Sequence, residues 1–276
     1  MKSKTQFTRG DGIVVFVSVA LVLNLSFVGE SGRQRARREV CLANLRLLTL
    51  AWNLYADDNE GKVVNGDTQE FGSMYRPGRP PALSHYEEPP WVLKDWSASQ
   101  TALEKKQAIR DGALFSYTGD IRLYRCPAWA RTATRSYSVV DSMNCKGWPG
   151  GKPMVKNRSE IERPTERFVF IDHGSELNKM LIMGGWTCYS DEDRWWDPVP
   201  VHHNDGANFS FVDGHVEYWK WKDPRTLEFG KQGTAPSGPQ NGNEDIRRTQ
   251  NATWGKPQAD DADNNEDQVP GGGASR

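Results

Sequence analysis

The pattern of apolar and polar positions begins with a short basic head followed by an apolar segment. Lys2, Lys4 and Arg9 precede an apolar run from Ile13 to Val28. A run of about 16 residues is at the lower limit for a membrane-spanning helix and within the range of a signal-peptide hydrophobic region. The pattern is therefore compatible with a cleaved signal peptide, a signal anchor, or the apolar half of a longer N-terminal helix.

The following residues predict that this helix continues with an amphipathic half. Apolar side chains recur at spacings of four and three residues, at Cys41, Leu45, Leu48, Trp52 and Tyr55. Residues 34–60 contain neither Pro nor Gly, and a polar run ending in Gly61 is typical of a helix end. We therefore expect one long helix, with an apolar half over residues 1–30 and an amphipathic extension over 31–60.

Residues 61–228 predict an α+β globular domain with a small antiparallel sheet. Ala102–Arg110 has the pattern of a short helix, and Phe168–Ile171 that of a short buried strand. Residues 75–92 are rich in Pro and Gly and predict a long surface loop. Residues 229–276 contain few apolar side chains, so we expect a disordered polar tail.

A β-hairpin is the clearest local prediction in this domain. Asp213-Gly214 separates two alternating runs, and this pair favours a two-residue primed turn. With such a turn, Phe211 would pair with Val216, and Phe209 would pair with Tyr218. These four side chains would then reach the core from one face of the sheet.

Composition changes this picture only in part. The net charge of −1 over 276 residues gives no electrostatic support for nucleic-acid binding. The chain has eleven tryptophans, several of them between Trp186 and Trp221. They predict either buried core residues, which we favour, or an exposed face that stacks on sugars or on a protein partner.

The four cysteines allow three full pairings. Cys126–Cys145 is the bridge that we favour, and Cys41 is expected to lie in the apolar stripe as a small buried side chain. No two cysteines have Cys-x-x-Cys spacing, which argues against a structural zinc site.

Two further sets of residues could bind a metal. His202, His203, Asp205, Asp213 and His215 are close in sequence, and Asp172-His173 follows the predicted strand, but the spacing does not favour a transition-metal site. Asp191, Asp193 and Asp197 form an acidic loop, which is either a calcium site or a solvated surface loop. No catalytic motif is recognisable, so we do not expect an enzyme.

The two ends of the chain resemble one protein family. His203 precedes Asp213-Gly214 with nine residues between, which resembles the H-X9-DG signature of bacterial type IV pilin-like and G-type pseudopilin-like proteins. Phe7-Thr8 resembles the start of the processed segment in that family. Asp11 stands where the family has a glutamate, and Gln6 stands where it has the glycine before the cleavage site, so the prepilin motif is degenerate.

The resemblance implies a long helix on a small sheet and a structural subunit of a type II secretion or type IV pilus-like system. It implies a single pass through the inner membrane with the globular domain outside the cytoplasm, although Arg33 to Arg38 do not favour this orientation by charge. The implied partners are other pilin-like subunits, secretion components and a prepilin peptidase, with methylation of the new N-terminus. His203, Asp213 and Gly214 would have structural roles in the hairpin. The alternative function is an anchored extracytoplasmic protein that binds a glycan or a partner through tryptophans, and a third hypothesis is a metal-dependent hydrolase.

Overall fold

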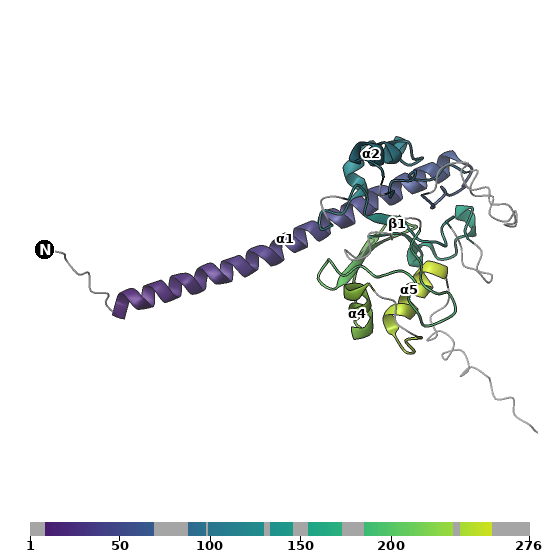
Figure 1. Ribbon diagram of the computed structural model, residues 1–276. Coiled ribbons are helices and arrows are strands. Elements are labelled where there is room, and N and C mark those ends of the chain that lie inside the picture. The colour runs from purple at the N-terminus through teal and green to yellow at the C-terminus, as the bar shows by residue number, and fades with distance from the viewer. Residues whose placement is uncertain are drawn as a thin grey trace, which may run out of the picture.

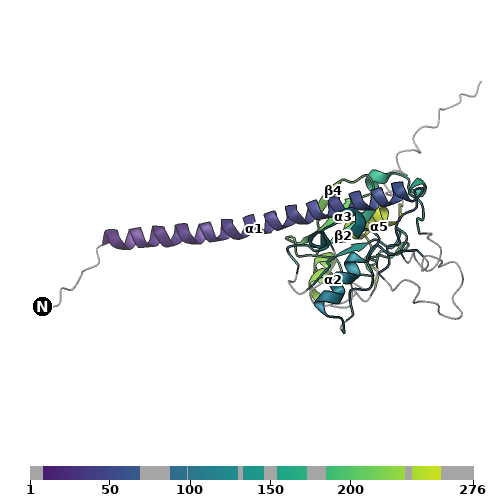
Figure 2. The same ribbon diagram turned by 90° about the horizontal axis from the view of Figure 1, so that it is seen from above.

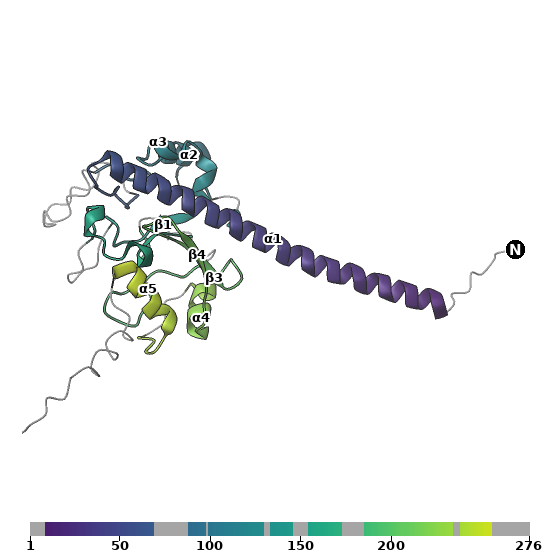
Figure 3. The same cartoon turned by 180° about the vertical axis from the view of Figure 1, so that it is seen from behind.

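A long helix leads into an α+β globular part in the computed structural model (Figure 1). The structure describes residues 9–68, 88–97, 99–129, 133–145, 154–172, 185–233 and 238–255, with side chains from residue 32 onward. Helix α1 spans Arg9–Asp58 and its N-terminal half extends away from the globular part in all three ribbon views (Figures 1–3). Among the described residues, no helix combines the length and the hydropathy that a membrane crossing needs.

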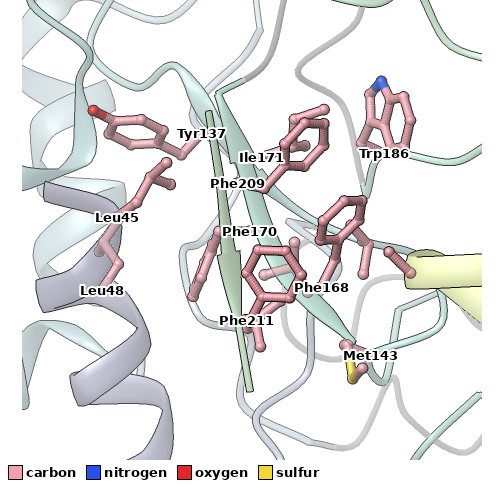
Figure 4. Close-up of a cluster of buried hydrophobic side chains, with 14 of the residues drawn as sticks. Leu45, Leu48, Tyr137, Met143, Phe168, Phe170, Ile171, Trp186, Phe209 and Phe211 are labelled. Carbon is pink, nitrogen blue, oxygen red and sulfur yellow. The ribbon is translucent and has the colours of Figure 1, made fainter. Parts of the chain in front are cut away.

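The C-terminal half of α1 packs on the sheet through the predicted stripe. Its fully buried apolar side chains are Cys41, Leu45, Leu48, Trp52 and Ala56. This half of the helix therefore belongs to the hydrophobic core, as the spacing predicts. Leu45 and Leu48 point from the helix toward the sheet in Figure 4.

The sheet has four antiparallel strands in the order β1-β2-β3-β4. The strands are β1 Tyr137–Val139, β2 Phe168–Asp172, β3 Gly206–Phe211 and β4 Val216–Lys220. The α+β class, the long N-terminal helix, the small antiparallel sheet and the strand at 168–171 are thus confirmed. A bulge between Phe168 and Phe170 shifts the register of β2 against β3.

The predicted hairpin register is wrong by one residue. Ser210 pairs with Val216 and Phe209 pairs with Glu217, while Phe211 N–H donates to the His215 carbonyl (3.0 Å). The loop therefore has three residues rather than two, with Gly214 at a φ of +92°. As a result, Val216 and Tyr218 lie on the opposite face of the sheet from Phe209 and Phe211.

The two faces of the sheet carry different layers. Phe170 lies on the face toward α1, against Trp91 (ring centroids 5.2 Å apart). On the other face Phe168 stacks on Phe209 with centroids 4.1 Å apart, and Trp219 packs beside both. Figures 1 and 3 show α1 on one side of the sheet and helices α4 and α5 on the other.

Short helices complete the globular part. α2 spans Ala102–Arg110, as predicted, and begins with a capping box formed by Thr101 and Glu104. The others are α3 Phe115–Thr118, η2 Ile121–Tyr124, η3 Arg158–Glu160, η4 Pro164–Glu166, α4 Pro224–Gln232 and α5 Glu244–Trp254.

The predicted start of a disordered tail at residue 229 is wrong, because α5 is part of the core. Ile246 and Trp254 are buried, and Asn243 caps the helix through the backbone N–H groups of its first turn. Arg248 lies over the Trp219 ring, 3.4 Å from its centroid. A few apolar residues at helical spacing are therefore enough to attach a polar segment to the sheet. Residues 256–276 lie outside the described part of the chain.

Candidate functional site

A buried cluster of sulfur, nitrogen and oxygen atoms lies where α1 meets the sheet. Cys41, Cys126, Asp172 and His203 each contribute one atom, and these atoms all lie within 4.8 Å of one another. The four residues come from α1, from the segment after η2, from the end of β2 and from the loop before β3. Tertiary folding therefore assembles the cluster from positions up to 162 residues apart.

Asp172 is the centre of the cluster. It ends β2 opposite Tyr137 of β1, and its side chain is fully buried. The backbone N–H of Asn208 donates to its Oδ1 atom (2.7 Å), which leaves Oδ2 facing the other members. A backbone donor on β3 thus holds one carboxylate oxygen, and the side chains of the cluster face the other.

The two histidines approach this same oxygen. His203 Nε2 lies 3.1 Å and His202 Nε2 3.4 Å from Asp172 Oδ2. Asn204 and Asp205 both have a φ of 61°, and this left-handed turn carries the chain from the histidines into β3. The ring of His202 also contacts the edge of Trp129, with centroids 5.3 Å apart.

Cys126 approaches the same ring nitrogen of His203 that faces Asp172. Its Sγ atom is 3.2 Å from His203 Nε2 and accepts from the backbone N–H of Ala128 (3.3 Å). The Cys126 N–H donates to the Ser136 hydroxyl (2.6 Å), so the backbone holds this cysteine at both sides.

Cys41 joins the cluster from the apolar stripe of α1. Its Sγ atom lies 3.8 Å from Asp172 Oδ2 and accepts a hydrogen bond from the Tyr137 hydroxyl (3.4 Å). Asn44, one helical turn later, donates to the Arg125 carbonyl (3.2 Å). Cys41 is therefore buried as expected, but its surroundings are polar.

The cluster perturbs the pKa values of its members. A hydrogen bond with Cys41 and contacts with the two histidines outweigh burial and lower the pKa of Cys126 to about 4. Burial lowers the pKa of His202, but hydrogen bonds with Asp172 and Cys126 raise it to about 10. Burial raises the pKa of Cys41 well above its ordinary value, and nearby negative charge adds to this effect. These pKa shifts favour an anionic Cys126 beside a protonated His202, and they favour the neutral thiol of Cys41.

This arrangement suits ligand binding better than nucleophilic catalysis. In a Cys-His-Asp triad, one ring nitrogen faces the sulfur and the other faces the carboxylate. Here the single Nε2 atom of His203 faces both Cys126 and Asp172. In addition, the two cysteines are fully buried, so no substrate reaches their sulfur atoms in this conformation.

The structure separates the residues of the H-X9-DG signature. His203 lies in the buried cluster and ties its loop to β2 and to the Cys126 segment. Asp213 and Gly214 form the hairpin tip, where Asp213 Oδ1 accepts from the backbone N–H of His215 (3.1 Å). The hairpin role expected for Asp213 and Gly214 thus agrees with their position, whereas His203 acts at a different place.

The predicted calcium ligands do not converge on one point. Asp197 accepts from the backbone N–H of Thr187 (2.8 Å), whereas Asp193 accepts from that of Gly242 (3.2 Å). Asp191 accepts from the Ser190 hydroxyl (3.4 Å). Each carboxylate thus has its own hydrogen-bond partner. Within the described ranges, the one grouping of metal-type ligands is that of Cys41, Cys126, Asp172 and His203.

The predicted Cys126–Cys145 bridge is wrong. None of the four cysteines, which all lie in the described part of the chain, forms a disulfide; all four are buried, and Cys126 faces a histidine instead. The sequence suggests Asp172, His202 and His203 as possible metal ligands, although their spacing does not favour a site. It does not connect Cys41 or Cys126 with them, because no local spacing does so. Two features of the sequence point toward the site: an aspartate ends an apolar strand, and a His-His pair precedes the hairpin. The structure places them next to each other.

The tryptophans are mainly core residues, as we favoured. Trp186, Trp195, Trp219 and Trp221 are buried, and Trp196 is 55% exposed. The exposed apolar surface of α1 is more extensive. Its members lie on one helical face at Val40 (51% exposed), Leu47 (44%), Leu50 (52%) and Leu54 (41%).

The processing residues cannot be placed. Gln6 and Phe7 lie outside the described residues, and Asp11 lies within α1 where the structure describes no side chains. Comparisons of the chain with protein-family models, curated proteins and solved structures found no match.

Proposed function

We propose that this chain is a membrane-anchored, pilin-like structural subunit of a type II secretion or type IV pilus-like system. The observation that carries the proposal is the division of α1. Its C-terminal half is built into the core through Leu45, Leu48 and Trp52, while its N-terminal half extends from the globular part (Figure 2). Such a helix is suited to packing against other helices and holding the globular part at a distance.

The exposed face of α1 supports the same proposal. Val40, Leu47, Leu50 and Leu54 form an apolar stripe on the side away from the sheet. Helices that bury such stripes against one another associate by ridge-and-groove packing. In this proposal the occupant of the stripe is the N-terminal helix of a neighbouring pilin-like subunit.

The resemblance of Phe7-Thr8 and Asp11 to a processed pilin start adds a covalent prediction. A prepilin peptidase would cleave between Gln6 and Phe7, and the new N-terminus would be methylated. Asp11 would then attract the N-terminal amine of a neighbouring subunit during assembly.

The experiment is to measure the mass and the N-terminal residue of the mature protein from native membranes. A chain that starts at Phe7 and carries an added methyl group is the expected result. A membrane-bound chain that retains its first six residues would refute processing and leave a permanent anchor. A chain recovered wholly in the soluble fraction would overturn the proposal of a membrane-anchored subunit.

A further inference from the structure

The distances within the buried cluster match the edges of a metal coordination sphere. With zinc–ligand bonds of about 2.0–2.3 Å, neighbouring atoms of a tetrahedral site lie about 3.3–3.8 Å apart. His203 Nε2 lies 3.2 Å from Cys126 Sγ and 3.1 Å from Asp172 Oδ2. Cys41 Sγ lies 3.8 Å from Asp172 Oδ2. Two of these separations are slightly shorter than the tetrahedral range and one lies at its upper end, and all four ligand atoms lie within 4.8 Å of one another.

We propose that Cys41, Cys126, Asp172 and His203 bind one divalent transition-metal ion of the zinc class. Two sulfurs, one imidazole nitrogen and one carboxylate oxygen form a donor set typical of zinc, whereas calcium and magnesium prefer oxygen alone. This proposal does not depend on the pilin-like function, because it concerns only the core of the globular part.

The burial of charge favours a cation at this place. The side chains of Cys41, Cys126 and Asp172 are fully buried, and a buried negative charge is costly unless a cation compensates it. His202 and His203 provide partial compensation when protonated. A divalent ion compensates the carboxylate and both thiolates from one central position, with His203 as a neutral ligand.

Hydrogen bonds around the cluster orient the ligands for such a role. The Asn208 N–H binds Asp172 Oδ1 and leaves Oδ2 free to coordinate. The Ala128 N–H and the Tyr137 hydroxyl donate to the sulfurs of Cys126 and Cys41. Donors that point at ligand atoms from outside are a regular feature of metal sites, since they fix geometry and stabilise the anionic form.

The chemistry of binding balances without a redox step. Cys41 and Cys126 both bind as thiolates, and each sulfur forms a bond to the metal. Any proton still held by either sulfur or by His203 Nε2 is released to solvent. The Asp172 carboxylate and the neutral Nε2 atom of His203 each donate a lone pair. Four protein ligands close the site, so the ion would have a structural role and would connect α1 to the sheet.

The test begins with the full chain, purified under reducing conditions without a chelator. Elemental analysis is expected to find about one zinc per chain. After exchange with Co²⁺, we expect a thiolate-to-cobalt charge-transfer band and the intense visible bands of tetrahedral cobalt. Chelation is expected to lower the Tm, and added Zn²⁺ is expected to restore it.

Single substitutions then assign the ligands. Cys126→Ser and Asp172→Asn are expected to lower zinc affinity at least about tenfold, since each removes or weakens a ligand. Cys145→Ser is the matched control, because Cys145 is also a buried cysteine outside any disulfide but lies outside the cluster. His203→Gln should release the ion, whereas His202→Gln should retain it.

Several outcomes would overturn the proposal. A wild-type chain that contains no transition metal and shows no cobalt bands would do so without any variant, even if the variants fail to fold. A Cys41–Cys126 disulfide, seen as a loss of two hydrogens by mass spectrometry, would assign the cluster to redox pairing instead. Loss of the ion in Cys145→Ser, or an unchanged zinc affinity in Cys126→Ser, would refute this ligand set.

Discussion

Arg135 and Asp95 form a bidentate ion pair in the interior of the protein. The Arg135 Nε atom lies 3.0 Å from Asp95 Oδ2, and its Nη2 atom lies 2.9 Å from Oδ1. The two side chains are 0% and 3% exposed, and the remaining Nη1 atom donates to the Tyr137 carbonyl (2.7 Å). The pair therefore fastens the loop that carries Asp95 to the first strand of the sheet.

Removal of one partner should leave a buried charge without compensation. Asp95→Ala is expected to lower the free energy of unfolding by about 3–5 kcal/mol, measured by urea denaturation. The double variant Asp95→Leu with Arg135→Met should recover most of this loss, because it removes both charges. Asp120→Ala breaks a solvent-exposed pair with Arg122 and should have a much smaller effect. If Asp95→Ala left the free energy of unfolding unchanged, this description of the core would be contradicted.

Gly112 lies too close to another backbone segment to carry a side chain. A Cβ atom there would meet the carbonyl of Trp91 and would lie 2.7 Å from the Val92 Cα atom. Gly112→Ala is therefore expected to destabilise the protein by about 1–3 kcal/mol, measured by thermal and urea unfolding. Gly238→Ala is the control, since no atom lies within 4 Å of its added Cβ, and it should change stability by less than about 0.5 kcal/mol. Equal effects of the two substitutions would argue against the close approach.

The cap of α5 should contribute measurably to stability. Asn243 is buried, and its Oδ1 atom accepts from the N–H groups of Asp245 (3.0 Å) and Ile246 (3.3 Å). Asn243→Ala is expected to lower the free energy of unfolding by about 1–2 kcal/mol. The neighbouring exposed Asn241 gives the matched control, and Asn241→Ala should have little effect. An unchanged Tm in Asn243→Ala would show that α5 does not unfold together with the sheet.

Asp223 should make a small, pH-dependent contribution at the start of α4. Hydrogen bonds from Arg225 lower the pKa of Asp223 below its ordinary value of 3.8, against the opposing effect of burial. A carboxyl with a lowered folded-state pKa stabilises the protein above 3.8, and this contribution is lost as the pH falls through the folded-state value. Asn also caps helices well, so Asp223→Asn should cost less than about 1 kcal/mol at neutral pH. The difference between the two proteins should disappear in acid, as measured by urea unfolding at several pH values.

The apolar stripe on α1 should govern self-association. Leu50→Gln is expected to reduce cross-linking between subunits in membranes or detergent, because Leu50 is 52% exposed at the centre of the stripe. Leu103 is 75% exposed on α2 rather than on α1, and Leu103→Gln therefore serves as the control. Unchanged cross-linking in Leu50→Gln would place the subunit contact elsewhere.

Periodicity along the chain was sufficient to predict the elements whose residues are local. The stripe from Cys41 to Tyr55, the helix Ala102–Arg110 and the strand from Phe168 all follow from short-range patterns. Asp213-Gly214 locates the hairpin, but the register of the two strands depends on how many residues at the tip lie outside the backbone hydrogen-bond ladder. Asp213-Gly214 is compatible with loops of two or three residues, and the pairing of Phe211 with His215 selects the longer one.

The cluster could not be predicted in the same way, because its members share no spacing. Cys41 was read only as a member of an apolar stripe, and Cys126 was assigned to a bridge with Cys145. The sulfur atoms of these two cysteines lie close together because α1 crosses the sheet near Asp172 at the end of β2, which is a property of the tertiary fold. The sequence does not predict α5 for a related reason. Its large apolar residues, Ile246 and Trp254, are few and widely spaced, and they are buried only because the helix packs on the globular part.

Cys41 also lies where the projecting half of α1 meets the core of the globular part. Along α1 it is the first fully buried residue among the side chains that the structure describes, after the exposed residues 32–37. After Arg38, whose guanidinium lies over the Tyr218 ring, Cys41 is therefore where a pull on the projecting half of the helix would enter the core, beside the end of β2. The helix lies across the sheet, so such a load would shear the interface rather than peel it open, and the residues around Cys41 would bear its first part.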